Sequence, residues 1–270
     1  MTEGTLRKMR TELVDPVDYQ LPVGEVLIDL NPLLGQEISL VYSGRIFCIE
    51  CGRKTNKSFN QGYCFPCLRR LAACDTCIVR PELCHYHEGT CREPQWGETH
   101  CMQPHVVYLA NSSGLKVGIT RKTQVPTRWI DQGAIQALPI AEVDTRLQSG
   151  FIETALKGTV NDKTDWRRML KGLQTKIDLM AEWEELRGST DGMLTEFRSR
   201  FGPHAIRLSE YEEPTQICYP VLCYPEKIKA HNFDKEKVVK GTLEGIKGQY
   251  LILDQGVLTV SYTHLRAHET

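Results

Sequence analysis

The alternation of apolar and polar positions predicts strands near both ends of the chain. Early runs at residues 23–28 and 38–42 are rich in β-branched residues and end at turn-forming residues. Later runs at 217–223, 238–243 and 250–253 have the same character. We expect the late strands to pair with the early ones in one small β-domain, with the middle of the chain inserted between them.

The middle of the chain alternates between strand and helix patterns. Runs at 106–110 and 115–120 flank the turn sequence Asn-Ser-Ser-Gly and predict a β-hairpin. A helix starting at Pro126 and running to about residue 136, a strand at 137–143 and a helix at 145–156 follow. Apolar residues at helical spacing predict a further helix over 162–187. The whole pattern predicts an α+β fold.

A cysteine-rich segment precedes this hairpin and predicts a zinc site. Nine of the eleven cysteines lie between Cys48 and Cys101. Two residues between two thiolates let both sulfurs face one ion, and two such pairs form a four-thiolate site. The simplest pairing uses Cys48, Cys51, Cys64 and Cys67. A cross-braced pairing of the first two cysteines with Cys74 and Cys77 is the alternative.

The other cysteines of the segment predict a second metal site. The favoured ligands are Cys77, Cys84, Cys91 and Cys101, with Cys74 or His87 as substitutes. Zinc is the expected metal, because four-cysteine sites in loop-rich modules are usually structural zinc sites. An iron–sulfur cluster is the alternative, since the spacing in this group is irregular. The apolar run around Cys218 and Cys223 favours a buried position for both thiols.

Composition and charge restrict the class of protein and its partners. No apolar run approaches the roughly 18 residues of a membrane span, and the polar first residues do not resemble a signal peptide. We therefore expect a cytoplasmic protein with reduced thiols. Lys and Arg against Asp and Glu number 3 and 7 in residues 1–44, 18 and 12 in 45–171, and 12 and 15 in 172–270. The basic middle favours DNA or RNA as a partner.

Residues 106–166 resemble the GIY-YIG nuclease superfamily. Val-Val-Tyr at 106–108 and Lys-Val-Gly at 116–118 stand where that superfamily carries its two hairpin motifs. An arginine follows at 128 and a glutamate at 153. More narrowly, the chain resembles an uncharacterised bacterial family that joins such a module to a cysteine-rich segment. Valine replaces the first glycine of the motif and lysine replaces the second tyrosine.

The resemblance implies a metal-dependent phosphodiester hydrolase, with Tyr108, Lys116, Arg128 and Glu153 as catalytic residues. Glu153 would bind one Mg²⁺ and Arg128 would hold a phosphate oxygen. Lys116 would lower the pKa of Tyr108 or stabilise phosphate charge, and Tyr108 would act as general base. Two alternatives differ in class: a non-catalytic zinc protein that binds nucleic acid, and an iron–sulfur or redox protein that uses the module as a scaffold.

These patterns divide the chain into five parts. They are N-terminal strands at 1–47, the zinc-binding segment at 48–105, the GIY-YIG-like module with a helical extension at 106–202, C-terminal strands at 203–260, and a tail at 261–270. The tail resembles translated sequencing-adaptor sequence, so we expect it to be non-native.

Overall fold

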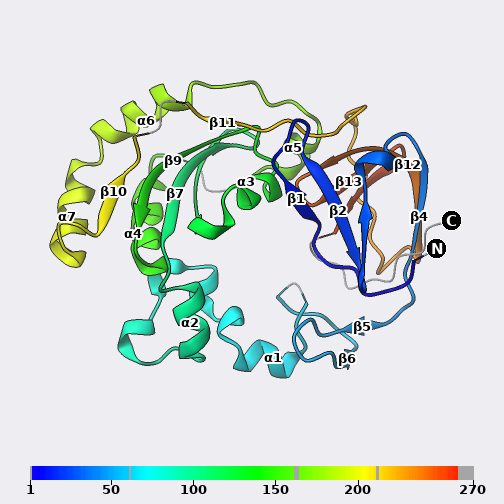
Figure 1. Ribbon diagram of the computed structural model, residues 1–270, viewed down its shortest axis with the longest axis horizontal. Coiled ribbons are helices and arrows are strands. Elements are labelled where there is room, and N and C mark those ends of the chain that lie inside the picture. Colours follow the sequence, from blue (N-terminus) through cyan, green and yellow to red (C-terminus); the bar gives the residue numbers. More distant parts are fainter. Residues whose placement is uncertain (1, 61, 161–163, 211–212, 261–270) are drawn as a thin grey trace.

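The structure, a computed structural model, describes residues 2–60, 62–160, 164–210 and 213–260. It is a mixture of helices and antiparallel sheets, as the α+β prediction requires. A central sheet stands beside a β-region built from both ends of the chain, and the cysteine-rich segment lies below them (Figure 1). The predicted non-native tail lies outside the described residues.

Strands from both ends of the chain meet in one four-stranded sheet. Its order is β14 (Gly256–Thr259), β13 (Tyr250–Leu253), β12 (Val238–Lys247) and β4 (Glu37–Val41). β4 and β12 pair antiparallel over five residues. A second, three-stranded sheet contains β1 (Arg10–Glu12), β2 (Asp18–Val23) and β3 (Val26–Asp29).

Two predicted strands of this region are wrong. Residues 23–28 do not form one strand, because Gly24 has a φ of +60° and turns the chain between β2 and β3. Residues 217–223 are not a strand either: β11 (Thr215–Gln216) ends just before them, and Val221 makes an isolated bridge to Gly245. Pro220 lies inside this run and has no N–H for a ladder.

The central sheet contains the predicted hairpin, β7 (His105–Asn111) and β8 (Leu115–Arg121). Its order is β10 (Ile206–Leu208), β9 (Gln136–Val143), β7 and β8, and β11 also pairs with β9. Every pairing in this sheet is antiparallel. β9 confirms the third strand expected in the middle of the chain.

Both faces of β7 are buried, and the two faces belong to different cores. Val106, Tyr108 and Ala110 point into a core shared with the terminal strands. Val107 and Leu109 point into the other core, which the helices cover. These helices are α4 (Arg146–Leu156), α6 (Leu179–Gly188) and α7 (Asp191–Phe201). A fully buried aliphatic side chain stabilises such a core by about 1.5–3 kcal/mol, so the sheet is held firmly from both sides.

The remaining predicted helices are shorter than expected. α3 (Thr127–Asp131) ends well before residue 136, because Gly133 adopts a φ of +65° and β9 begins three residues later. The helix predicted over 162–187 is split into α5 (Trp166–Leu170) and α6, and Gly172 turns the chain after α5 with a φ of +65°. Residues 161–163 are not described.

The cysteine-rich segment has little regular structure. It contains β5 (Ile46–Phe47), β6 (Lys54–Thr55), α1 (Phe65–Arg70), α2 (Pro94–His100) and four 3₁₀ turns: η2 (Ala72–Cys74), η3 (Thr76–Ile78), η4 (Pro81–Leu83) and η5 (Tyr86–Glu88). Two further turns, η1 (Asn31–Leu33) and η6 (Lys122–Gln124), lie outside it. Cys218 and Cys223 are exposed, so their predicted burial is wrong. Within the described ranges, no helix has the length and apolar character needed to cross a membrane.

Candidate functional site

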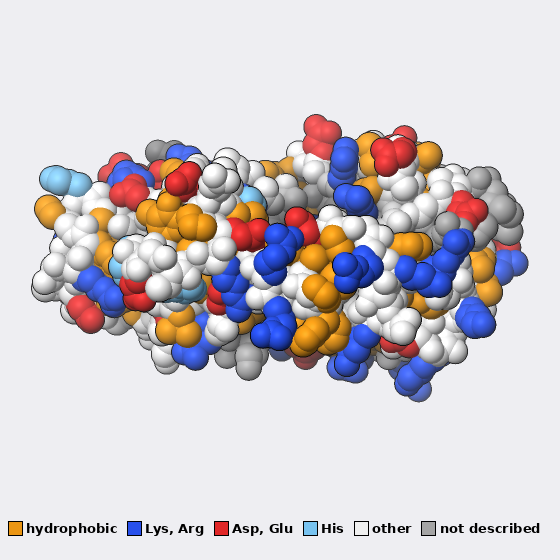
Figure 2. Space-filling model, turned by 90° about the horizontal axis from the view of Figure 1, so that it is seen from below, with side chains coloured by type: hydrophobic (Ala, Val, Ile, Leu, Met, Phe, Trp, Pro, Cys, Tyr) orange, Lys and Arg blue, Asp and Glu red, His pale blue; other side chains and the backbone are white. Residues whose placement is uncertain are grey.

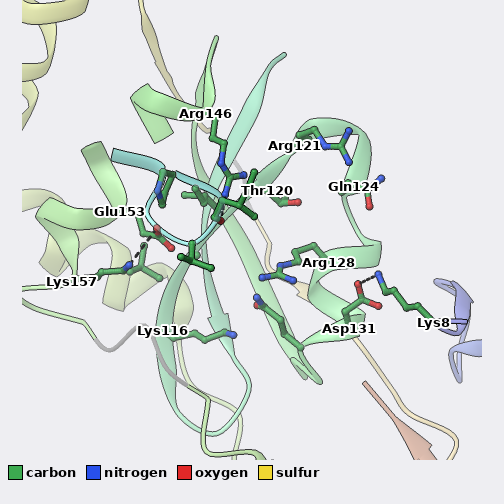
Figure 3. A pocket seen from close by; sticks show the side chains of 17 residues that line it. Lys8, Lys116, Thr120, Arg121, Gln124, Arg128, Asp131, Arg146, Glu153 and Lys157 are labelled. Carbon is green, nitrogen blue, oxygen red and sulfur yellow. Dashed lines mark hydrogen bonds and ion pairs between the residues drawn. The ribbon is translucent and has the colours of Figure 1, made fainter. Parts of the chain in front are cut away.

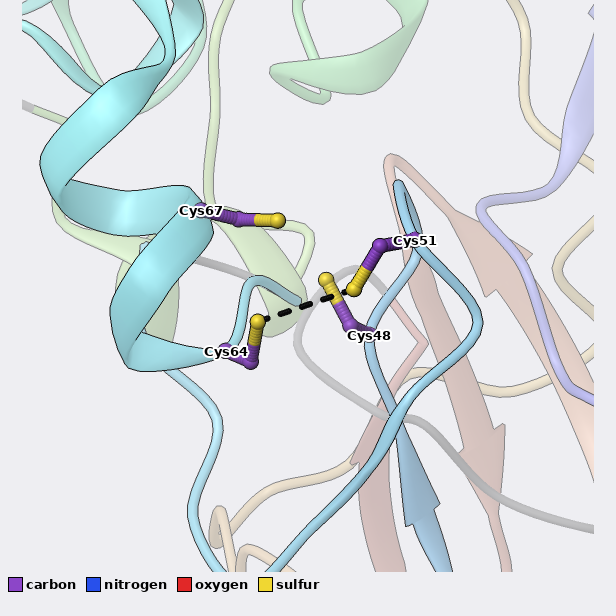
Figure 4. A group of neighbouring side chains, drawn as sticks. All are labelled: Cys48, Cys51, Cys64 and Cys67. Atoms are coloured by element: carbon purple, nitrogen blue, oxygen red, sulfur yellow. Dashed lines mark hydrogen bonds between the residues drawn. The ribbon is translucent and has the colours of Figure 1, made fainter.

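The first four cysteines form a compact cluster that suits a structural metal such as zinc. The sulfurs of Cys48, Cys51, Cys64 and Cys67 all lie within 4.8 Å of one another and converge in Figure 4. The Cys51 and Cys64 sulfurs are 3.7 Å apart. A tetrahedral site with Zn–S bonds of about 2.3 Å separates its sulfurs by about 3.8 Å. The simplest pairing is therefore confirmed, and the cross-braced pairing is wrong.

Local structure places these four sulfurs in different surroundings: burial and the neighbouring thiols raise the pKa of Cys67 to about 12, whereas the pKa of Cys48 is lowered. Cys48 and Cys51 occupy the turn between β5 and β6, while Cys64 caps α1 and Cys67 lies in its first turn. Burial alone would raise the pKa of Cys48, but backbone N–H groups, including those of Cys51 and Cys64, lower it to about 6. A thiol that ionises this readily is a good metal ligand.

The predicted second group is only partly brought together. Cys77, Cys84 and Cys101 lie in one buried cluster, against which Tyr86 and Trp96 pack. Cys91 is half-buried, and its sulfur would lie 3.3 Å from a Cβ at Gly97. Cys77 also forms a group with Asp75 and His85, since possible ligand atoms of these three residues lie within 4.8 Å of one another. His87, the predicted substitute, is exposed and faces Glu88 at 3.8 Å.

An open pocket of about 480 Å³ lies between the hairpin, α3, α4 and the cysteine-rich segment. It brings together three of the four residues predicted for catalysis: Lys116 from β8, Arg128 from α3 and Glu153 from α4 (Figure 3). The fourth, Tyr108, is fully buried beneath it.

Tyr108 lies directly behind the pocket surface. It pairs with Gly118 across the hairpin, and a Cβ at Gly118 would come within 2.7 Å of the phenol oxygen. Gly118 therefore provides room for the tyrosine ring. The Tyr108 hydroxyl donates to Oε1 of Gln132, 2.9 Å away, and Gln132 lines the pocket.

The surroundings of Tyr108 raise the pKa of its phenol. Burial raises the pKa of Tyr108 to about 12, and the charge of Arg128 acts in the opposite direction without cancelling the effect. Glu153 also raises this pKa. Arg128, and not Lys116, is thus the principal cation acting on the phenol. At neutral pH the phenol is a hydrogen-bond donor.

Lys116 and Glu153 are both held by neighbouring groups. Lys116 is only 4% exposed, and its Nζ donates to Oγ1 of Thr164 at 2.9 Å. A Glu153 carboxylate oxygen lies 3.4 Å from Nζ of Lys157, one turn along α4. The Glu153 side chain is 13% exposed and lines the pocket.

The pocket is strongly basic. Six Lys or Arg residues line it against two acidic residues, Asp131 and Glu153; the basic residues are Lys8, Lys116, Arg121, Arg128, Arg146 and Lys157. Asp131 forms a salt bridge with Lys8 and accepts from Gln249 at 2.9 Å. These contacts fix α3 to the terminal β-region. Such an excess of cations suits a phosphate-bearing ligand.

The cysteine-rich segment supplies one wall of the pocket through Ile78, Val79 and Pro81. Arg146 holds this wall, because its Nη2 donates to the Ile78 carbonyl at 2.6 Å. α4 packs directly against η4, since a Cβ at Gly150 would lie 2.5 Å from the backbone nitrogen of Glu82. Glu153 lies one turn further along the same helix.

Residues 35–265 match the family described as "Protein of unknown function (DUF2797)". The chain belongs to this family. No curated protein matches this DUF2797 member, and no solved structure matches it. The match spans the cysteine-rich segment, the central sheet and β4 with β12–β14, whereas β1–β3 lie before it.

Sequence reasoning missed several pocket residues of this DUF2797 member. Arg121, Arg146 and Lys157 had no predicted role, although all three line the pocket. Arg121 and Lys157 could have been predicted from the sequence. Arg121 lies on the same strand as Lys116, and Lys157 lies one helical turn from Glu153. No feature of the sequence indicates that η3 and η4 form a wall of the pocket, because this wall depends on packing between segments that are distant in the chain.

Proposed function

We propose that this protein is a metal-dependent phosphodiester hydrolase of the GIY-YIG type that acts on nucleic acid, with its cysteine segment stabilised by zinc. The observation that carries the proposal is the open basic pocket in which Lys116, Arg128 and Glu153 converge above Tyr108. Lys116, Arg128 and Glu153 come from β8, α3 and α4. Tyr108 comes from β7, the strand that pairs with β8 in the hairpin. The order of these four residues along the chain is the one implied by the resemblance.

Each of these side chains suits one part of phosphodiester hydrolysis. Water adds across a P–O bond: its oxygen bonds to phosphorus, the bond to the sugar oxygen breaks, and that oxygen takes up a proton. Arg128 can hold a non-bridging oxygen through its planar guanidinium. Lys116 adds charge that offsets the negative charge developing on the phosphoryl group. Both line the pocket, but Lys116 is only 4% exposed and would have to turn from Thr164 to meet a phosphate.

Glu153 fits a single hard cation. Its carboxylate faces an open pocket, and the only other carboxylate of the lining is held by Lys8 and Gln249. Mg²⁺ often binds through one or two carboxylates and keeps several waters. When bound, the ion would supply positive charge and a more acidic water. Lys157 would have to give up part of its contact with the carboxylate.

We assign Tyr108 a positioning role. With its pKa raised to about 12 by burial, the phenol keeps its proton at neutral pH and is a poor general base. Its hydroxyl instead holds Gln132, which lines the pocket beside Arg128. The ring also packs edge-on against Trp129, with centroids 6.0 Å apart. Tyr108 thereby fixes α3, the helix that carries Arg128.

A basic and aromatic surface on the zinc module supports nucleic acid as the substrate. The rings of Phe59 and Phe65 lie 5.8 Å apart, and Phe65 is 53% exposed. Lys57 lies over the first ring at 5.3 Å, and Arg69 over the second at 6.0 Å. Figure 2, which views the molecule from the side of this module, shows many Lys and Arg side chains with hydrophobic ones between them. Bases stack on such rings while cations bind phosphates.

The test is cleavage of single-stranded DNA, double-stranded DNA and RNA with Mg²⁺. Glu153→Gln should lower the rate about a hundredfold or more, in line with the loss of one group that stabilises the transition state. Glu184→Gln is the matched control, since Glu184 is an exposed glutamate of α6. No cleavage by the wild type, or equal cleavage by Glu153→Gln, would overturn the catalytic proposal.

A second candidate is a non-catalytic nucleic-acid-binding zinc protein. The observation that favours it is the buried, protonated Tyr108, which removes the expected base. Salt-dependent binding without turnover, unchanged in Glu153→Gln, would select this candidate. Under either candidate, Phe65→Ala should weaken binding by about tenfold, since one stacked base contributes about 1–3 kcal/mol. Leu222→Ala, another exposed hydrophobic residue, is the control for that variant.

A further inference from the structure

We propose that Cys77, Cys84, Cys101 and His105 bind a second structural zinc ion. The three thiols are buried together, although they come from η3, from the end of η4 and from the end of α2. His105 is the first residue of β7 and follows Cys101 after three residues. The proposed set is thus Cys₃His, a common composition of structural zinc sites.

His105 is prepared as a metal ligand. Its side chain is 0% exposed, and its Nδ1 donates to the Gln103 carbonyl at 2.6 Å. This bond fixes the tautomer and leaves a lone pair on Nε2. That Nε2 is buried without a hydrogen-bond partner in the part of the chain that the structure describes. Ligating histidines typically donate their other ring N–H to a carbonyl or carboxylate in this way.

An unpartnered buried nitrogen needs an explanation. Leaving such a group unsatisfied is unfavourable, because folding removes its water and supplies no replacement partner. Side-chain interactions connect Cys84 to both Cys77 and Cys101, and the Cys84 charge also acts on the His105 ring. An ion held by these thiols and by the unused nitrogen of His105 would satisfy that nitrogen.

The other candidates for the fourth ligand are held by other groups or lie elsewhere. His85 contacts Thr90 through Nδ1 at 2.7 Å, and its Nε2 faces Asp75 at 3.6 Å. Asp75 is itself bound by Arg92 at 2.7 Å. Cys91 is half-buried beside Gly97. Cys74, the substitute suggested by the sequence, is buried against the first cysteine cluster.

The charge balance of the site is also favourable. Three thiolates and one neutral histidine around Zn²⁺ leave a net charge of −1. Arg146 lies beside the cluster, since its Nε is 3.4 Å from the Cys77 carbonyl oxygen and its charge acts on all three thiols. A cation next to an anionic metal site stabilises it.

The proposed ion would connect the pocket wall to the central sheet. η3 and η4 carry Ile78, Val79 and Pro81 of the wall, whereas His105 begins the strand that carries Tyr108. One ion would tie these two parts at a fixed distance. The site stands independently of whether the pocket cleaves nucleic acid.

Metal content of the purified full-length chain tests the inference. The wild type should contain about two zinc ions, one for each set of four ligands. Cys84→Ser and His105→Asn should each lose about one, while Cys91→Ser and His85→Asn should keep both. His105→Cys should also keep both, and this rescue separates the loss of a ligand from a failure to fold. With Co²⁺ in place of zinc, His105→Cys should increase the thiolate-to-metal absorbance.

Three outcomes would overturn the inference. The first is a wild type with a single zinc ion. The second is full zinc content in His105→Asn together with a loss in Cys91→Ser or His85→Asn. The third is iron with inorganic sulfide and a brown colour after anaerobic purification, which would assign these thiols to an iron–sulfur cluster.

Discussion

The cysteine-rich segment and the central sheet are neighbours that are held together by different means. In the segment, regular structure is limited to two-residue strands, the short helices α1 and α2 and 3₁₀ turns, and most of its buried hydrophobic side chains are cysteines. In the sheet, all seven residues of β7 are buried, and two apolar cores cover its faces. We expect a segment with so little apolar burial to need metal–ligand bonds to fold, and we expect the sheet to need none.

Of the changes that should affect the two regions differently, metal removal is expected to have the largest effect. A strong chelator should unfold the cysteine-rich segment, because zinc contributes about 10–16 kcal/mol to the folding of small zinc modules. Limited trypsin digestion should then cut at Arg53 and Arg69, which are exposed in this segment. Circular dichroism should show that the central sheet persists. Simultaneous loss of both regions would show that the sheet also depends on metal.

Truncation of a core side chain should destabilise the central sheet and leave metal binding by the cysteine-rich segment unchanged. Ile140 on β9 is 0% exposed and packs in the helix-covered core. Ile140→Ala should lower the free energy of unfolding by about 2–5 kcal/mol, measured with urea. Zinc content should remain that of the wild type. Leu173→Ala is the control, because this side chain is exposed and its truncation should change stability by about 0.5 kcal/mol or less.

A rise in pH should stabilise the cysteine-rich segment and the packed terminal sheet that contains Lys247, but over different pH ranges. Acid protonates thiolates and releases metal from the segment. In the packed part, burial lowers the pKa of Lys247 to about 8, from 10.5 in the unfolded chain. Between these values the unfolded chain keeps a proton that the folded chain has lost, so stability rises with pH from about 8 to about 10.5.

Lys247→Met tests this dependence. The shift of 10.5 − 8 = 2.5 pKa units corresponds to about 3 kcal/mol. Urea unfolding at several pH values should therefore show a flatter profile for the variant, with the gap to wild type changing by about this amount between pH 8 and pH 10.5. The contacts of Lys247 with Gln174 and Tyr219 are lost at every pH and shift the whole curve. An unchanged slope would show that Lys247 is not the group responsible.

The smallest effect on stability is expected for a substitution at Gly118, which lies between the pocket and Tyr108. Gly118→Ala would bring a Cβ within 2.7 Å of the Tyr108 ring, which must then shift. We expect a loss of about 1–3 kcal/mol in stability, typical of overpacking. The near-ultraviolet signal of the buried aromatic residues should change with it. Gly188→Ala is the matched control, because nothing lies within 4 Å of its Cβ position.

Local spacing explains which parts of the fold and site could be predicted. The hairpin and the first cysteine cluster depend on residues close together in the chain, and both were confirmed. The long helix over 162–187 was wrong because tertiary contacts override its pattern: Gly172 turns the chain beside Tyr224, where a Cβ would clash at 2.6 Å. The spacing of apolar residues along the sequence does not indicate that contact.

The same reasoning applies to the metal ligands and the pocket. Cys64 and Cys67 follow a known interval, whereas the Cys77 group is drawn from turns that only the fold brings together. His105 reads as a strand residue in the sequence, and its spacing of three residues from Cys101 is its only signal. The pocket residues named by the resemblance lie in one place, but the wall of η3 and η4 required the structure.

The pairing of β4 with β12 has a consequence for the order of folding. Residue 37 must find residue 242, so about two hundred residues have to be synthesised and arranged before β4 gains its partner. Such distant contacts close late and slow the final step of folding. Until then β4 is an exposed edge that can pair with another chain. Co-translational aggregation, and the demand for chaperones, should therefore depend on how quickly the last three strands emerge.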